Sequence, residues 1–221
     1  MKLYHHILCP KSRFARVLLE EKNIPIELES IEYWHDVQKH KSIDPTLEFP
    51  ILQIDAETII SGYYPLMEYI AQITNSFLGD EIDALQIARI RKILYWLNER
   101  FHKEVTHYIL NEKLFRLSVN GAFPRTDFLR AARINFIHHL NYFDTQMQKF
   151  GYLASPNLSI ADISFACHIS VLDYFSEINW DRYLWLKEWY APIKSRPSFR
   201  NILHDRISFI SPPAHYDNLD F

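Results

Sequence analysis

The chain has 221 residues, of which 48% are apolar, with 4 glycines and a net charge of −3. This composition supplies a packed core and argues against a low-complexity chain. No stripe of lysine and arginine indicates nucleic-acid binding, and no run of roughly 18 apolar residues indicates a membrane helix. The N-terminus lacks the apolar stretch of a signal peptide, and the two cysteines, Cys9 and Cys167, lie far apart. We therefore expect a cytoplasmic protein with free thiols, and neither nucleic acid nor a membrane as its partner.

The first third of the chain alternates between strand and helix patterns. Its strand candidates are apolar runs or alternate apolar with acidic side chains, and its helix candidates repeat apolar residues every three or four positions. We expect strands over 3–8, 26–31 and 58–60, a turn followed by a strand over 48–54, and helices over 12–22 and 64–73. This order of elements predicts a small α/β layer.

From about Asp83 onward the pattern becomes purely helical. Apolar residues step by three and four along 87–101 and again along 128–150, so each helix presents one stripe to a core. The change of period falls within the connector 75–80. We therefore expect an α/β domain over 1–77, an all-helical domain over 83–208 and a tail over 209–221.

Cys9 and Pro10 follow the first predicted strand and open a helical pattern. The first N–H groups of a helix carry partial positive charge and stabilise a thiolate, which is the reactive form of cysteine. A proline at the first helical position gives up no hydrogen bond. Taken alone, this segment fits a reactive thiol and a buried structural cysteine about equally.

Two further patterns concern structure and metals. Ser159 and Asp162 match a capping box, in which the serine accepts from the first turn of the helix and the carboxylate bonds back to the serine N–H. We expect a structural role for both residues. The histidine pairs at 5/6, 35/40, 102/107 and 138/139 lack the spacing that sets two ligands on one helix face, so we predict no metal site.

Four segments in a fixed order carry a resemblance over nearly the whole chain: 9–12, 49–52, 158–162 and 189–199. They resemble the first helix, the cis-proline loop, the capping box and the C-terminal helix of cytosolic glutathione S-transferases. The resemblance implies an α/β thioredoxin-like N-terminal domain, an all-α C-terminal domain and a homodimer.

A narrower resemblance is carried by 96–106, 172–181 and the ending 212–221. These segments are similar to those of the glutathione-transferase-like cell-division proteins of alphaproteobacteria, which bind the tubulin-like filament of the division ring. This narrower resemblance implies a dimeric interaction protein with a tubulin-like cell-division protein as partner. The alternative is an active glutathione S-transferase, or a glutathione-dependent thiol transferase, that uses Cys9.

The family resemblance also implies roles for individual residues. If the protein is active, Cys9 is catalytic beside the glutathione sulfur, and Ser12 donates to its thiolate from one helical turn further on. The backbone of Phe49, before a cis-Pro50, pairs with the cysteinyl part of glutathione.

Gly62 and Tyr63 depart from the family pattern. Active members carry a glutamate and a serine at these positions, and these residues hold the γ-glutamyl group of glutathione. Losing one charge-assisted hydrogen bond costs on the order of 1.5–3 kcal/mol. We therefore expect Phe49, Pro50, Gly62 and Tyr63 to form a degenerate site with a millimolar or weaker dissociation constant. The double change Gly62→Glu with Tyr63→Ser should tighten it.

The tail from 209 to 221 has prolines at 212 and 213, which disfavour a helix and predict an extended segment. Its aromatic and acidic side chains are typical of anchors in a protein interface. We expect deletion of 213–221 to weaken partner binding and to leave the melting temperature nearly unchanged. The predicted partner-binding residues are Tyr216, Asp217, Leu219, Asp220 and Phe221.

Overall fold

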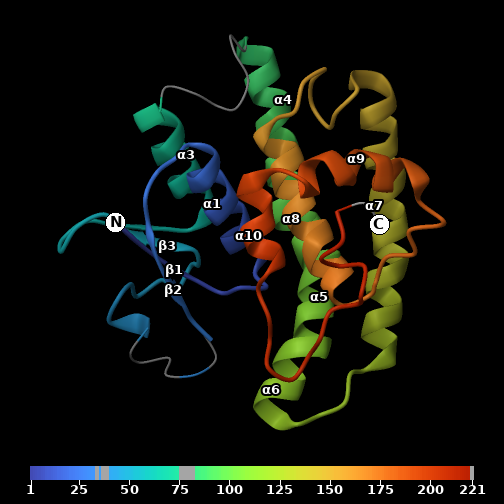
Figure 1. The fold of residues 1–221 in the computed structure, drawn as a ribbon, viewed down its shortest axis with the longest axis horizontal. Coiled ribbons are helices and arrows are strands. Elements are labelled where there is room, and N and C mark those ends of the chain that lie inside the picture. The colour runs from blue at the N-terminus through green and yellow to red at the C-terminus, as the bar shows by residue number, and fades with distance from the viewer. Residues whose placement is uncertain (33–34, 36–39, 75–82, 220–221) are drawn as a thin grey trace. The chain divides into compact units, whose positions relative to one another are not determined.

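A computed structural model describes residues 1–32, 35, 40–74 and 83–219 (Figure 1). Packing divides the chain into two compact units. The first joins Met1–Ser76 to Pro197–Asp205, and the second joins Phe77–Arg196 to Arg206–Phe221. The connector expected at 75–80 lies outside the described residues. In the described part of the chain, no helix is long and apolar enough to cross a membrane.

A four-stranded sheet forms the centre of the first unit, in the order β2-β1-β3-β4. β2 runs parallel to β1, whereas β3 runs antiparallel to both β1 and β4. The strands are β1 (Lys2–His5), β2 (Glu27–Ser30), β3 (Ile51–Gln53) and β4 (Ile59–Ser61). The described residues of this unit also include the helices α1 (Pro10–Glu21), α3 (Tyr63–Thr74) and α10 (Pro197–Leu203). This is the thioredoxin-like layer that the resemblance implied.

The core of the first unit follows from the period of each element. Side chains alternate along β1, so Leu3 is fully buried while its neighbour Lys2 is not. In α1, Phe14, Val17 and Leu18 recur at helical spacing and are buried. The α/β layer therefore has the core that the sequence pattern predicted.

Two strands of this sheet differ from their predicted form. β1 ends at His5 because the next residues turn, and the Cys9 N–H donates to the His6 carbonyl at 3.1 Å. The alternation over 26–31 predicted a buried apolar face for β2, yet Leu28 is 46% exposed. β2 lies at the edge of the sheet, so Leu28 has a strand neighbour on one side only.

A long helical run opens the second unit, from Ala84 to Asn120. It begins where the Asp83 carboxylate accepts the Gln86 N–H at 2.7 Å, and it ends at Gly121, whose φ of 59° suits a glycine. Within it, α4 (Ala84–Tyr95), α5 (His107–Leu110) and α6 (Arg116–Asn120) alternate with two π-helical stretches, η1 (Trp96–Thr106) and η2 (Asn111–Phe115).

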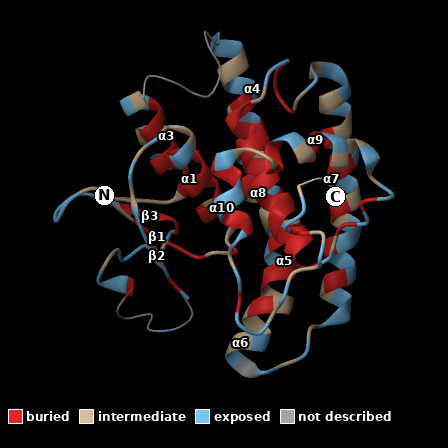
Figure 2. Cartoon of the chain, viewed as in Figure 1, coloured by how far each residue is buried: buried red, intermediate tan, exposed pale blue. Residues whose placement is uncertain are grey.

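The described residues of this unit form three more helices: α7 (Thr126–Phe150), α8 (Ile160–Tyr174) and α9 (Leu184–Lys194). Every residue of α8 is buried, and Figure 2 shows it buried along its length. A helix that is buried on all sides forms the centre of its core. Among the described residues after Asp83, the only β pairing is a single bridge between Ile207 and Ile210. The all-helical second half is therefore as predicted.

The position of α10 differs from the domain limits drawn from sequence. Residues up to 208 were expected in the helical domain, but Pro197–Asp205 packs with the first unit. The Asn201 amide donates to Glu20 of α1 at 2.6 Å, and Ser198 bonds to Glu21. The helical period of α10 cannot reveal which unit its apolar face joins.

Candidate functional site

The turn 6–9 and the start of α1 position the first candidate residue. Cys9 is the N-cap of α1, with φ −78° and ψ 119°, and Pro10 is the first helical residue. The Cys9 carbonyl accepts the Arg13 N–H at 2.9 Å, which begins the helical hydrogen bonds. Cys9 is partly exposed, whereas Cys167 is buried. The thiol of Cys9 therefore lies at the positive end of a helix and within reach of solvent.

Ser12 lies within the first turn of α1 and is fully buried. Its Oγ accepts a hydrogen bond from the His6 N–H at 3.4 Å. Among the hydrogen bonds of the described residues, none joins Ser12 to the Cys9 sulfur. The expected donation to a Cys9 thiolate is therefore wrong for this structure, because the Ser12 side chain is buried against the preceding turn.

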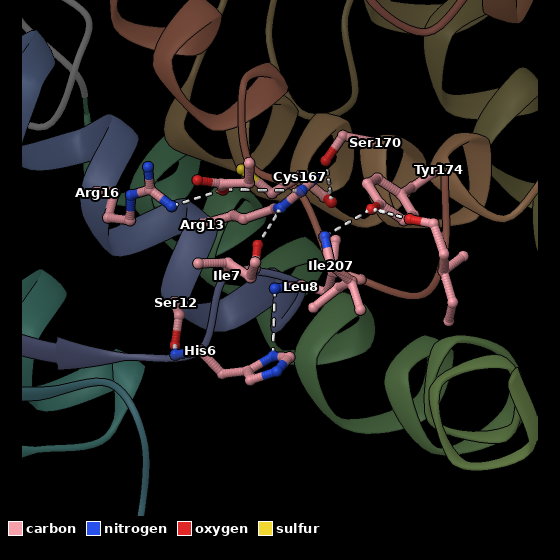
Figure 3. A network of polar contacts seen from close by, with 12 residues as sticks. His6, Ile7, Leu8, Ser12, Arg13, Arg16, Cys167, Ser170, Tyr174 and Ile207 are labelled. Atoms are coloured by element: carbon pink, nitrogen blue, oxygen red, sulfur yellow. Dashed lines mark hydrogen bonds and ion pairs between the residues drawn. The ribbon is translucent and has the colours of Figure 1, made fainter. Parts of the chain in front are cut away.

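A buried arginine braces the same turn (Figure 3). Arg13 Nε donates to the Ile7 carbonyl at 2.7 Å, and its Nη2 lies 3.8 Å from Asp205 Oδ2. Arg16 Nη1 donates to the same carboxylate oxygen at 2.7 Å. One carboxylate therefore serves two arginines of α1 and fixes the loop that carries Cys9. Sequence reasoning missed Asp205 because nothing local links it to α1.

Two histidines, His5 and His6, are buried beside the turn. His6 Nδ1 accepts the Leu8 N–H at 3.2 Å, so its ring is neutral with the proton on Nε2. Burial, and next the charge of Arg16, lowers the pKa of His5 to about 3. Burial, and next the charge of Arg13, lowers the pKa of His6 to about 4. Both rings are therefore neutral in the folded protein near neutral pH.

Stability should fall in acid because of these two histidines. Each has a pKa of about 6.5 in the unfolded chain, so the unfolded state binds protons below that pH while the folded state does not. This contribution is fully present above about pH 6.5 and is lost as the pH falls towards the folded pKa values. At pH 5 the loss is on the order of 2 kcal/mol for each histidine. Urea denaturation at pH 7 and pH 5 should show a smaller acid loss for His6→Asn, because asparagine accepts the Leu8 N–H but does not titrate.

The matched control is His204→Asn, since the His204 side chain is exposed. It should leave the acid loss unchanged. An acid loss in His6→Asn equal to that of the unchanged protein would contradict the role of His6.

The second group of candidate residues meets where β3 and α3 begin. The Phe49–Pro50 bond is cis, which confirms the expectation from the resemblance. The Gly62 N–H donates to the Glu48 carbonyl at 2.7 Å and to the Pro50 carbonyl at 3.0 Å. These bonds close the cis-proline loop onto the start of α3.

Gly62 has a φ of +87°, a conformation that favours glycine. A Cβ at this position would have room, with Pro65 Cδ nearest at 3.7 Å, but the backbone would be strained. The change Gly62→Glu therefore brings a stability cost that the sequence did not reveal. Tyr63→Ser alone is the cleaner test of this site.

Tyr63 is the first residue of α3 and is 8% exposed. Lys11 Nζ lies 5.3 Å from the centre of its ring, a cation–π contact. Pro65, in the same first turn, contributes no N–H. The start of α3 thus holds a buried aromatic ring where the family pattern places a glutamate and a serine, and it is a poorer anion site than a full helix terminus.

Glu48 is a neighbour of Gly62 that the sequence pattern did not indicate as a site residue. Its Cβ lies 3.9 Å from the position of a Cβ on Gly62. The Glu48 side chain is exposed, so its carboxylate is hydrated. An acidic residue therefore lies beside the position where the family's glutamate is missing. Glutathione fits these residues only in part, since Cys9 and the cis-proline are in place and the helix-end ligands are not.

The capping box of the second unit is present as predicted. Asp162 is fully buried and accepts from the Ser159 N–H at 3.0 Å, the Ser159 hydroxyl at 2.8 Å and the Leu153 N–H at 3.0 Å. It also accepts from Trp189 Nε1 at 3.3 Å. Burial raises the pKa of Asp162, and the N–H donors oppose that shift. The box therefore joins α8 to the loop before it and to α9.

The start of the tail is fixed by Tyr174 of α8 (Figure 3). The Tyr174 hydroxyl accepts the Ile207 N–H at 3.0 Å and donates to the Ile210 carbonyl at 2.7 Å. Further on, the tail turns, and the Tyr216 N–H donates to the Pro213 carbonyl at 2.9 Å. The tail was expected to be extended, but it turns at 213–216, so the expectation is wrong for that part.

Two charged side chains hold the rest of the tail. Lys194 Nζ, at the end of α9, donates to the His215 carbonyl at 3.2 Å and the Asn218 carbonyl at 2.7 Å. Burial lowers the pKa of Lys194 to about 8, opposed by the charges of Asp173 and Asp217. Asp173 Oδ1 lies 2.8 Å from His215 Nε2. The tail is therefore part of the fold of the second unit.

The predicted partner-binding residues of the tail have different surroundings. Tyr216 is fully buried against Tyr174, at 5.3 Å between ring centres, so its side chain is no exposed anchor, contrary to prediction. Asp217 is 52% exposed and paired with Arg206, and Leu219 is half-buried. Residues 220 and 221, predicted as Asp220 and Phe221 anchors, lie outside the described residues.

The α/β layer with a cysteine at the first helix N-cap and a cis-proline before β3 is the arrangement expected of glutathione S-transferases. A family model described as the N-terminal domain of glutathione S-transferase matches residues 3–76. The chain belongs to the glutathione S-transferase family.

One curated relative is FtsZ-localized protein A of Caulobacter vibrioides, which is 34% identical over 224 residues, or 99% of this chain and 97% of that protein. The solved structure of FzlA from C. crescentus has a TM-score of 0.93 at 33% identity and covers 100% of this chain and 99% of that one. A glutathione S-transferase structure from Rhodospirillum rubrum F11 has a TM-score of 0.92 at 36% identity, with the same coverage.

Proposed function

We propose that this protein is a glutathione-transferase-fold interaction protein of bacterial cell division that binds the tubulin-like filament FtsZ. The observation that carries the proposal is similarity along the whole chain, at 34% identity, to FtsZ-localized protein A. The structural match to FzlA extends over both units, including the tail. A family resemblance limited to the catalytic layer would not favour this role over a transferase.

The incomplete glutathione site also supports a role in protein contacts. Tyr63 and Pro65 weaken the helix terminus that would hold the γ-glutamyl carboxylate, and the neighbouring residue Glu48 is exposed. We propose that glutathione binds weakly. Cys9 then needs no catalytic partner, and Ser12 has a structural role in the turn.

A cleft beside the tail supports a binding surface on the second unit. It has a volume of about 700 Å³ and is lined by the loop 176–181, by His215 of the tail and by Arg133 and Lys187. Trp180, in its wall, donates from Nε1 to Asp173 at 2.9 Å, so the loop and the tail share one buried carboxylate. We propose that the exposed residues of the tail and this cleft contact the filament.

We also propose a cytoplasmic homodimer. Leu85 and Tyr95 of α4 are 59% and 67% exposed, and Ala88 and Lys92 lie between them at helical spacing. Two large apolar side chains exposed on one face of a helix favour a surface that another chain covers. Analytical ultracentrifugation tests this surface. The unchanged protein should sediment as a dimer, and Tyr95→Lys should shift the population towards the monomer.

Co-sedimentation with polymerised FtsZ tests the proposed function. The unchanged protein should pellet with filaments. Asp217→Asn should pellet severalfold less, because the exposed carboxylate is lost and the paired Arg206 is left as a positive charge that repels a basic partner. The matched control is Glu188→Gln, an exposed carboxylate on α9 that should have no effect. If the unchanged protein does not pellet with filaments, the proposal fails.

The second candidate function is a glutathione-dependent enzyme, favoured by the partly exposed Cys9 at the N-cap of α1. When bound, glutathione supplies a thiol for conjugation or disulfide exchange. This chain would hold the Cys9 thiol near it at the positive helix end. The relative from R. rubrum F11, described as a glutathione S-transferase, keeps this candidate open.

Titration calorimetry with glutathione separates the two functions. We expect a dissociation constant of about 1 mM or weaker, which supplies only about −4 kcal/mol. Glu48→Gln should remove any residual binding if Glu48 pairs with the ammonium, and Tyr63→Ser should tighten binding. Micromolar binding by the unchanged protein would favour the enzyme, whatever the filament assay gives.

A further inference from the structure

β2 leaves one side of its backbone available for a further strand. Within the described sheet it pairs with β1 alone. The Glu27 N–H donates to the Met1 carbonyl and the Ile31 N–H donates to the His5 carbonyl, so these groups point towards β1. Because successive residues of a strand alternate, the backbone groups of Leu28 and Ser30 point the other way. They form an open edge.

An apolar groove runs beside this edge. It has a volume of about 430 Å³ and is lined by Ile24, Ile26 and Leu28 on the β2 side and by Ile202 of α10. Leu28 is 46% exposed. Arg16 also borders the groove, and it shares the Asp205 carboxylate with Arg13, which leaves one positive charge that Glu20 of the same groove offsets. A side chain from a strand added at this edge would therefore meet an apolar surface on the Leu28 face.

The opposite face of the same edge is acidic. Glu27 and Glu29 are 70% and 37% exposed in their side chains, and both pair with Lys2, at 3.2 and 2.5 Å. Two carboxylates thus share one ammonium, which leaves a net negative charge. On the groove side, Glu20 has the neutral partner Asn201. The charge at this edge is complementary to a basic segment.

We propose that the outer edge of β2 binds an extended segment of another protein in which basic and apolar residues alternate. The segment would add a fifth strand, bonding to the backbone of Leu28 and Ser30. Its apolar side chains would enter the groove, and its basic side chains would lie beside Glu27 and Glu29. This surface lies within the first unit and does not depend on the proposed filament contact of the tail.

A second copy of this chain is a poorer occupant of the same edge. Pairing β2 with another β2 would place glutamates opposite glutamates, and like charges across neighbouring strands are destabilising. The charge pattern therefore favours a partner of opposite sign over self-association.

The test uses a fluorescent peptide of six residues that alternates lysine with valine or leucine, measured by anisotropy with the full chain. We expect saturable binding that weakens as salt rises, because exposed ion pairs are screened. A peptide with glutamate in place of lysine should bind at least about tenfold more weakly. So should a lysine peptide N-methylated at alternate backbone amides on its strand-pairing edge, which blocks pairing without any change to the protein.

Protein variants locate the binding on β2. Ser30→Pro removes the outward N–H of Ser30, and Leu28→Lys adds a like charge to the groove, so each should weaken the lysine peptide about tenfold or more. The control is Ile73→Lys on α3, which is equally exposed, at 49%, and should have no effect. Absence of binding would mean that the glutamates only protect an edge strand. Binding that ignores backbone methylation would also overturn the proposal.

Discussion

Asp162→Ala is expected to lower the free energy of unfolding by on the order of 4 kcal/mol. The Asp162 carboxylate is fully buried and accepts from Leu153, from both donors of Ser159 and from Trp189. Alanine would leave three buried N–H donors without an acceptor, each at about 1–3 kcal/mol, with less than full additivity. A thermal melt should show a drop in melting temperature of roughly 10 °C for a chain of this size.

Two further variants make this prediction specific. Asp144→Ala removes a half-buried carboxylate of α7 that accepts the Gln148 amide at 3.0 Å, and it should cost less than about 1 kcal/mol. Ser159→Ala should be intermediate, because it loses the cap hydroxyl but keeps the carboxylate. Similar melting temperatures for Asp162→Ala and Asp144→Ala would contradict the prediction that the hydrogen bonds to Asp162 stabilise the fold.

Tyr216→Ala is expected to cost about 3–5 kcal/mol, as for other large buried aromatic residues. The ring is fully buried and packs against Tyr174. Deletion of 213–221 should cost at least as much, since it also removes two carbonyl acceptors of the buried Lys194 ammonium, those of His215 and Asn218. This replaces the expectation from sequence that the deletion would leave the melting temperature nearly unchanged.

The control for the tail is Phe209→Ala. Phe209 is another aromatic residue of the same segment but is 49% exposed, so its loss should cost less than about 1 kcal/mol. Chemical denaturation of both variants checks the difference. A tail deletion with an unchanged unfolding midpoint would mean that the contacts of Lys194 and Tyr216 contribute nothing to stability. Filament assays on the tail are therefore better made with Asp217→Asn than with a truncation.

Features carried by neighbouring residues could be predicted from the sequence. The capping box needs only Ser159 and Asp162, and it is present. The helix start at Pro10 is equally local, because the first turn of α1 tolerates a proline. The cis bond before Pro50 came from the family resemblance, and no propensity argument would have given it.

Features that depend on distant contacts could not be predicted in the same way. Asp205 joins Arg13 and Arg16 from the far end of the chain, and Glu48 meets Gly62 through the loop before β3. The sequence around an aromatic residue such as Tyr216 does not reveal whether the ring packs on its own domain or on a partner protein. Leu28 likewise looked buried because alternation cannot distinguish an edge strand from a central one.

The return of 197–205 to the first unit has a consequence for synthesis on the ribosome. The loop that carries Cys9 is braced by Asp205, which is made only after nearly all of the helical unit. At about 5–20 residues per second, synthesis from α1 to Asp205 takes on the order of ten seconds. During that interval the guanidinium of Arg13 lacks the ion pair with Asp205 that it makes in the folded protein. The nascent N-terminal layer therefore emerges incomplete and gains these contacts only after Asp205 has been synthesised.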